Sequence, residues 1–259
     1  GLVVDVRPDL PMHTVLRFDI DAVDVEENKD AAVHKPARQG FRSVNAGICH
    51  ACGHDGHAAI GLGTALELIR YRAKLNHNIR IIFQPAEECG QGAAAMLAAG
   101  IADSAKYFFA LHIGVQAREN HALVCGTKGF LASTKFDVEF WGRAAHAGVD
   151  PQEGKDSILA ASNAVLNMHA IPRHGHGDTR INVGLLTGGT GRNVIPSYAK
   201  LTCETRGTTM AVNDYMFDKA MRVIEHSAAM YEQDCKISIM GKVDSAISDK
   251  KVADIVKAA

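Results

Sequence analysis

Apolar runs and helical patterns alternate along the first part of the chain. Apolar, β-branched runs lie before Asp19 and over residues 78–83 and 107–113, and polar side chains follow each of them. Residues 58–72 carry apolar side chains at helical spacing. Because the carboxyl ends of parallel strands meet at one edge of an open sheet, these polar side chains are expected to gather there. The pattern predicts an α/β fold with a doubly wound, mostly parallel sheet.

The pattern changes near Gly126. The elements expected beyond it are strand, helix, strand, strand, helix and strand, over residues 130–141, 154–169, 179–186, 194–206, 213–231 and 235–240. This β-α-β-β-α-β order is typical of a small ferredoxin-like α+β domain. We therefore expect the first domain to begin over residues 1–128, an inserted domain over residues 129–241, and a return to the first domain over residues 242–259.

Composition narrows the class of protein. Hydrophobic residues make up 47% of the chain, which is enough for a sizeable core. The 28 basic and 29 acidic residues give a net charge of -1, so the chain lacks the positive field that attracts nucleic acid. It shows no apolar run of membrane-spanning length and no start resembling a signal peptide. Its cysteines are scattered rather than arranged as a disulfide framework, which favours a cytoplasmic enzyme.

Residues 50–57, with the sequence HACGHDGH, place three imidazoles, a thiol and a carboxylate close together. Cys52 and His54 are two residues apart, so both can reach one metal ion, and Asp55 can orient a ligand. A single Cys or His in an apolar setting is more often part of a core. Burying several polar groups without partners is costly, so we interpret the cluster as one half of the ligands of a metal site. His50 and His57 are expected to support the ligands rather than bind.

Two further strand ends supply polar groups of the same kind. Glu87 and Glu88 follow the strand over residues 78–83, and His112 lies at the end of the strand over residues 107–113. One glutamate can bind metal while its neighbour moves protons, which is suited to hydrolysing an amide with metal-activated water. The alternative for the glutamates is a helix first turn that favours carboxylates. The alternative for His112 is an ordinary isolated histidine.

The predicted inserted domain contains three more candidates, which are His146 in GRAAHAG, Asn193 in GGTGRNVIP and Arg206 in CETRG. A histidine among small residues can donate to a developing oxyanion, and an Asn with an Arg can clamp a carboxylate. On spacing alone, a turn histidine, a turn asparagine and a surface arginine are favoured. GGTGRN lacks the GxGxxG spacing and precedes a strand-like segment, so NAD binding is not expected.

The chain resembles a known family in five ordered motifs, which are HACGHDGHAA, FQPAEE, ALHIG, GRAAHAGVDPQEGKDSI and GGTGRNVIP. The family is the amidohydrolase branch of the dinuclear-metal aminoacylase and carboxypeptidase superfamily. This branch includes hippurate, auxin-conjugate and aminobenzoyl-glutamate hydrolases, and the segments RFDIDAV and HKPARQGFRS are most similar to the last group.

The resemblance implies a phosphorylase/hydrolase-like catalytic domain with two divalent metal ions, either zinc or manganese, with cobalt also compatible. It implies that the inserted domain is a lid that also dimerises, giving a homodimer or a heteromer. The residues that match the family's metal ligands are Cys52, His54, Glu88 and His112, and Glu87 matches its general base. His146 matches a histidine that reaches the partner's active site, and Asn193 and Arg206 match substrate-binding positions.

These matches lead us to expect hydrolysis of an amide that joins an acyl or aroyl group to an amino acid. The leading expectation is cleavage of p-aminobenzoyl-glutamate to p-aminobenzoate and glutamate. Members of the family extend further at both ends and supply one more histidine ligand from a C-terminal segment, so we expect this chain to be a truncated part. The alternatives are a non-catalytic binding subunit of a hetero-oligomeric hydrolase and a structural zinc protein, which would need a closed four-ligand site.

Overall fold

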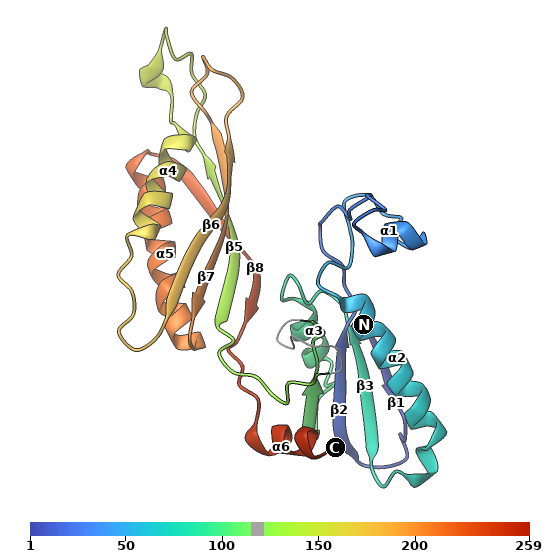
Figure 1. Cartoon of the computed structure of the whole chain (residues 1–259). Coiled ribbons are helices and arrows are strands. Elements are labelled where there is room, and N and C mark those ends of the chain that lie inside the picture. The colour runs from blue at the N-terminus through green and yellow to red at the C-terminus, as the bar shows by residue number, and fades with distance from the viewer. Residues whose placement is uncertain (115–121) are drawn as a thin grey trace. The chain divides into compact units, whose positions relative to one another are not determined.

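The computed structural model describes residues 1–114 and 122–259 (Figure 1). Contacts divide the chain into two compact units, with Gly1–Cys125 and Asp254–Ala259 in the first and Gly126–Ala253 in the second. The domain boundaries that the sequence predicts after residues 128 and 241 stay a prediction.

A four-stranded sheet forms the centre of the first unit. Its strands, in the order β1-β3-β2-β4, are β1 (Leu2–Asp5), β3 (Asn78–Gln84), β2 (Met12–Asp19) and β4 (Tyr107–Ala110). β2 runs parallel to both β3 and β4, while β1 is antiparallel at one edge. The fold is therefore α/β with a mostly parallel, mixed sheet. The carboxyl ends of three strands meet at one edge because Asp19 pairs with Gln84 and Arg17 with Ala110.

Helix α2 (His54–Arg70) covers one face of this sheet, where it contacts β2 and β3. Phe18 and Ile81 pack there with Ala65 of the helix. A Cβ atom at Gly61 would lie 2.7 Å from the Phe83 ring and 2.9 Å from the Phe18 ring. The absence of a side chain at Gly61 thus allows the helix to lie directly on the two rings. The remaining helical segments of this part of the sequence are α1 (Lys35–Gln39), η1 (Arg72–Lys74) and α3 (Gly92–Ala98).

An ion pair joins two strands of the first sheet. The Arg80 guanidinium donates two hydrogen bonds of 2.9 Å to the Asp5 carboxylate, which also accepts one of 2.8 Å from Asn78. The hydrogen bond from Arg80 lowers the pKa of Asp5, against the opposing effect of burial. The pair is largely shielded from water, with 27% of the Asp5 side chain exposed.

The second unit has the β-α-β-β-α-β order predicted from the pattern. Its elements are β5 (Ala132–Trp141), α4 (Ser157–His169), β6 (Thr179–Gly188), β7 (Tyr198–Gly207), α5 (Met210–Met230) and β8 (Asp234–Val243). The strands form an antiparallel sheet in the order β6-β7-β5-β8. Both helices contact this sheet and each other (Figure 1). Two further short elements of the described chain are η2 (Pro151–Glu153) and α6 (Lys250–Ala258).

Alternation along β5 places Phe136, Val138 and Phe140 in the core of the second unit, where α5 contributes Met216. Side chains cap both long helices, since Asp156 accepts from the first turn of α4 and Thr209 accepts from that of α5. In the described parts of the chain, we find no helix with both the length and the apolar composition needed to cross a bilayer.

Candidate metal centre

The HACGHDGH segment changes from loop to helix at Gly53. Gly53 has a left-handed backbone conformation with φ of 87°, which favours glycine, and α2 begins at the next residue, His54. The sequence pattern had predicted the helix only from residue 58. The earlier start places His54 and His57 on one side of the first helical turn, and both side chains are fully buried.

His54 presents a buried lone pair. Its Nδ1 lies 3.1 Å from the backbone oxygen of Asp21 and 3.0 Å from Asp21 Oδ1. Both atoms are acceptors, so Nδ1 carries the proton and Nε2 carries the lone pair. Among the residues that the structure describes, Nε2 has no hydrogen-bond partner. Asp19 Oδ1 and Glu88 Oε1 each lie 3.8 Å from it.

A tight turn after β3 presents the two glutamates. Ala86 adopts a left-handed conformation with φ of 53°, and the backbone N–H groups of Gln91 and Gly92 both donate to its oxygen. A Cβ atom at Gly92 would lie 1.7 Å from the Pro85 oxygen, so the turn requires glycine there. The backbone N–H of Glu88 donates to Asp21 Oδ2 over 2.9 Å. Asp21 therefore fixes both His54 and the glutamate turn.

Cys52 and His112 complete the cluster. The Cys52 Sγ lies 3.4 Å from His112 Nε2, while His112 Nδ1 donates to the Ile113 oxygen over 2.9 Å. The possible ligand atoms of Cys52, His54 and His112 lie within 4.8 Å of one another, and the same holds for His54, Glu87 and Glu88. The structure thus brings together all four predicted ligands and the predicted base.

The surroundings disfavour negative charge on Cys52 and Glu87. Burial, a hydrogen bond with Glu88 and nearby carboxylates raise the pKa of the Cys52 thiol to about 11. Burial also raises the pKa of Glu87, and the charges of Glu88 and Asp19 act in the same direction. A bound cation would reverse this balance, because it favours thiolate and carboxylate over their protonated forms.

The residues present fit a divalent cation. A buried imidazole nitrogen with an unused lone pair would be costly to leave without a partner. It is surrounded by a thiol, a second imidazole and two carboxylates, and this mixture of donors suits zinc, manganese or cobalt. Asp21 holds His54 in the orientation and tautomer that a metal ligand needs, as carboxylates commonly do for ligating histidines.

The roles of Asp19 and Asp21, and the partners of His57, became visible only in the structure. The sequence showed two carboxylates at the end of a strand, but not that Asp21 would hold two predicted ligands at once. His57 donates from Nδ1 to Asp19 Oδ1, and its Nε2 accepts from the backbone N–H of Ile113. Both ring nitrogens are engaged, in agreement with its expected supporting role.

In the second unit, the structure brings His146 and Asn193 together. The two loops that carry them are joined by backbone hydrogen bonds, including one of 3.0 Å from the Ala147 N–H to the Asn193 oxygen. The Gly148 N–H donates to His146 Nδ1 over 3.1 Å. The proton of the neutral imidazole is therefore on Nε2, where it can be donated to a ligand.

Arg206 lies near the other end of the same sheet. It pairs with Ser133 at the start of β5, whereas Tyr198, beside the Asn193 loop, pairs with Trp141 at the end of β5. Arg206 lies eight positions beyond Tyr198 along the extended strand, which is roughly 27 Å at about 3.4 Å per residue. Within one chain, Asn193 and Arg206 cannot hold the same carboxylate. The Arg206 guanidinium instead makes two hydrogen bonds to Glu204.

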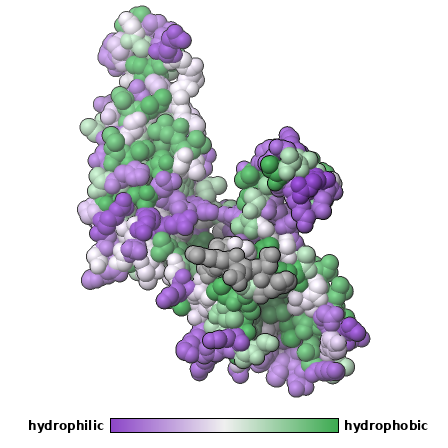
Figure 2. All heavy atoms as spheres, in the orientation of Figure 1, coloured by the Kyte–Doolittle hydropathy of each residue, from purple (hydrophilic) through white to green (hydrophobic). Residues whose placement is uncertain are grey.

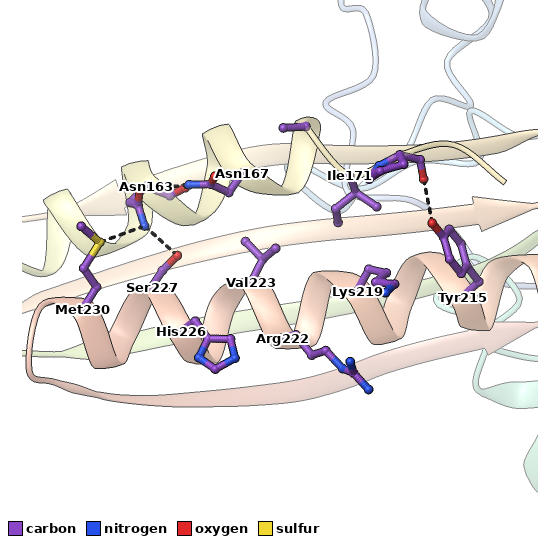
Figure 3. Close-up of a pocket in the computed structure, with 12 residues that line it drawn as sticks. Asn163, Asn167, Ile171, Tyr215, Lys219, Arg222, Val223, His226, Ser227 and Met230 are labelled. Carbon is purple, nitrogen blue, oxygen red and sulfur yellow. Dashed lines mark hydrogen bonds between the residues drawn. The ribbon is translucent and has the colours of Figure 1, made fainter.

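A groove of about 520 Å³ lies between α4 and α5 of the second unit (Figure 3). Asn163 projects from α4 and donates to Ser227 on α5 over 3.0 Å, and Lys219 and Arg222 also line the groove. It contains none of the predicted site residues.

Comparison with known proteins identifies the family. The family model described as peptidase family M20/M25/M40 matches residues 15–257. The chain belongs to this peptidase family. The M20/M25/M40 assignment agrees with the resemblance carried by the five motifs.

Two curated relatives and one solved structure of a similar protein are informative. The chain is 47% identical over 247 residues to indole-3-acetyl-aspartic acid hydrolase from Enterobacter agglomerans, covering 95% of the chain and 56% of the relative. It is 48% identical over 225 residues to a p-aminobenzoyl-glutamate hydrolase subunit from Escherichia coli (strain K12), covering 87% and 51%. The crystal structure of an aminobenzoyl-glutamate utilization protein from Klebsiella pneumoniae matches with a TM-score of 0.80 and 41% identity, covering 99% and 57%. The chain thus spans about half the length of the two curated relatives.

Proposed function

We propose that the protein is a metal-dependent amidohydrolase that cleaves the amide between an acyl or aroyl group and an amino acid. The observation that carries this proposal is the buried lone pair of His54, which faces a thiol, an imidazole and two glutamates. The names of two relatives, one acting on an aminobenzoyl-glutamate and one on an indoleacetyl-aspartate, support an aromatic acyl group joined to an acidic amino acid. We take p-aminobenzoyl-glutamate, cleaved to p-aminobenzoate and glutamate, as the leading substrate.

Cys52, His54, Glu88 and His112 would hold two divalent metal ions. The number of two rests on the resemblance to the dinuclear-metal family, and the mixed sulfur, nitrogen and oxygen donors suit zinc, manganese or cobalt. When bound, the ions lower the pKa of water and polarise the amide carbonyl.

Glu87 is the proposed general base. Its partly buried carboxylate lies beside the proposed ligands, where a base that acts on metal-activated water is needed. It would accept a proton from the attacking water and donate it to the leaving amine nitrogen.

The residues of the second unit would act on the substrate. His146, with its proton on Nε2, would donate to the oxyanion in a partner chain's site. Asn193 and Arg206 would hold polar groups of the amino acid. Because they lie at opposite ends of one sheet, two chains would have to supply them to a single substrate carboxylate.

The second unit is the proposed lid and dimerisation domain, in a homodimer or a heteromer. Apolar side chains reach the molecular surface in Figure 2. The exposed leucines of the second unit are Leu185 and Leu186 on edge strand β6 and Leu159 and Leu166 on α4. An edge strand with exposed leucines is suited to pairing with another chain. Sedimentation of the full-length protein tests this, because Leu185→Lys should yield monomers, and an unchanged assembly would exclude this face.

The proposal places the enzyme in the cytoplasm, which is supported by six free cysteines. The alternative, a non-catalytic binding subunit, is disfavoured because the curated relatives are named as hydrolases or hydrolase subunits. One relative is named as a subunit of a hydrolase, so catalysis could require a second kind of chain. The decisive measurement is therefore catalysis by the purified full-length protein alone.

The test is release of glutamate from p-aminobenzoyl-glutamate, compared with glycine release from hippurate, with and without added metal. Glu87→Gln should bind metal as the wild type does and lose about 10²–10⁴-fold in turnover. Glu67→Gln, at an exposed carboxylate of α2, is the matched control and should retain activity. A wild-type protein that binds metal but cleaves neither amide would favour the binding subunit. Substantial activity in Glu87→Gln would disprove the assignment of the base.

A further inference from the structure

His57 is a fully buried histidine that the proposed reaction does not use. Its Nε2 lies 2.9 Å from the backbone nitrogen of Ile113, and a backbone N–H can only donate. The imidazole must therefore accept at Nε2 and carry its proton on Nδ1, which faces Asp19 Oδ1. A neutral imidazole with the proton on Nε2 and a doubly protonated imidazole are both incompatible with this contact.

Asp19 is itself held in place. It is 1% exposed, and its Oδ2 lies 2.7 Å from an Arg17 nitrogen. Arg17 also donates from Nε to the side chain of buried Gln84 over 2.8 Å. The carboxylate is fixed on one side by the guanidinium and on the other by His57, so His57 has a fixed orientation and a defined tautomer.

Through its Nε2 atom, His57 holds the segment that carries a predicted metal ligand. Ile113 directly follows His112, and its oxygen accepts the hydrogen bond from His112 Nδ1. The rings of His57 and His112 also meet edge to face, with their centroids 4.7 Å apart. His112 is exposed, so contacts through its neighbour are important for its orientation.

The side chain of Ile113 is held from the same motif. A Cβ atom at Gly56 would lie 2.5 Å from Ile113 Cδ1, and one at Gly53 would lie 3.0 Å from Cγ1. The two glycines of the HACGHDGH segment make room for this side chain. Ile113 is thus bound by its backbone to His57 and by its side chain to the glycines.

We propose that His57 is a positioning residue, which holds the Ile113 backbone and thereby keeps the His112 imidazole oriented for metal binding. Arg17 and Asp19 keep His57 in the required tautomer. The inference rests on the proposed metal site, but its consequences are metal affinity and hydrogen bonding rather than turnover. Loss of catalysis would therefore leave it testable.

Matched variants separate the two hydrogen bonds of His57. The amide oxygen of Gln reaches the position of Nε2, so His57→Gln keeps an acceptor for Ile113, whereas His57→Asn keeps only the donor to Asp19. In the full-length protein, titration with Zn²⁺ or Co²⁺ against a chelator should show about ten- to hundredfold weaker binding for His57→Asn. His57→Gln should stay within about threefold of wild type, and His77→Asn, an exposed histidine elsewhere in the first unit, should match wild type. Equal affinity for all variants, or equal loss in Asn and Gln, would overturn the proposal.

A measurement on the unmodified protein covers the case in which His57→Asn does not fold. Nitrogen NMR of the metal-free protein should show His57 protonated on Nδ1 and a coupling across the hydrogen bond between the Ile113 amide and Nε2. A proton on Nε2 would overturn the proposal whatever the variants do. Absence of metal binding in the wild type would instead disprove the proposed function, while the NMR result would still decide the role of His57.

Discussion

Asp21→Asn tests whether one carboxylate organises the metal centre. The Asp21 oxygens accept separately from His54 Nδ1, over 3.0 Å, and from the Glu88 backbone, over 2.9 Å. Asparagine has the same shape but only one acceptor oxygen, so its amide N–H₂ would face one of these two donors. Either the glutamate turn would lose its hydrogen bond, or His54 Nδ1 would keep only the backbone oxygen of residue 21 as its acceptor.

The expected magnitude follows from the loss of one hydrogen bond to a charged acceptor, which is about 1.5–3 kcal/mol. The Asp21 side chain is 16% exposed, so water can compensate only in part. At about 1.4 kcal/mol per factor of ten, metal affinity should fall by roughly 10- to 100-fold.

The assay is competition for Zn²⁺ between the metal-free protein and a chelator of known affinity. Asp24→Asn, at an exposed carboxylate three residues further along, is the matched control and should bind as the wild type does. Unchanged affinity in Asp21→Asn, or an equal loss in the control, would refute the reasoning.

Three further predictions concern stability, measured by urea unfolding. The pKa of Asp5 is lower in the folded state, so its stabilisation is complete above about pH 4 and is lost as pH falls through the folded pKa. Asp5→Asn should therefore reduce acid sensitivity, and an unchanged pH profile would contradict this. Gly92→Ala places a methyl group against the Pro85 oxygen, so it should lower the free energy of unfolding by about 1–3 kcal/mol and weaken metal binding. The control is Gly63→Ala, which has open space around it and should be neutral or stabilising. Equal effects of the two substitutions would exclude the close contact at Gly92. Met216→Ala should destabilise the second unit by about 2–5 kcal/mol, and a cost below about 1 kcal/mol would argue against its full burial.

The order of elements was largely readable from the sequence because burial imposes a periodic pattern. The six elements of the second unit follow the predicted order, and β3 ends one residue beyond the predicted range. The start of α2 was missed by four residues, because the left-handed conformation of Gly53 allows a helix to begin among polar residues. Hydrophobic spacing has no signal for such a start.

The candidate site was predictable in its members but not in its connections. Spacing and motif gave Cys52, His54, Glu88 and His112, and the structure places them together. The histidine nitrogen that carries the lone pair for a metal ion is decided by hydrogen-bond partners that are distant in sequence. For His54 this partner is Asp21, which accepts from Nδ1. Such pairings are set by tertiary packing rather than by local pattern.

The separation of Asn193 and Arg206 along one sheet has a genetic consequence. If one substrate needs Arg206 from one chain and Asn193 from another, a chain altered at Arg206 and a chain altered at Asn193 would each be inactive alone. Mixed together, they would form hybrid dimers in which one of the two sites is fully intact. Random pairing in equal amounts would restore about a quarter of the wild-type sites. Two defective alleles of this gene would therefore complement each other.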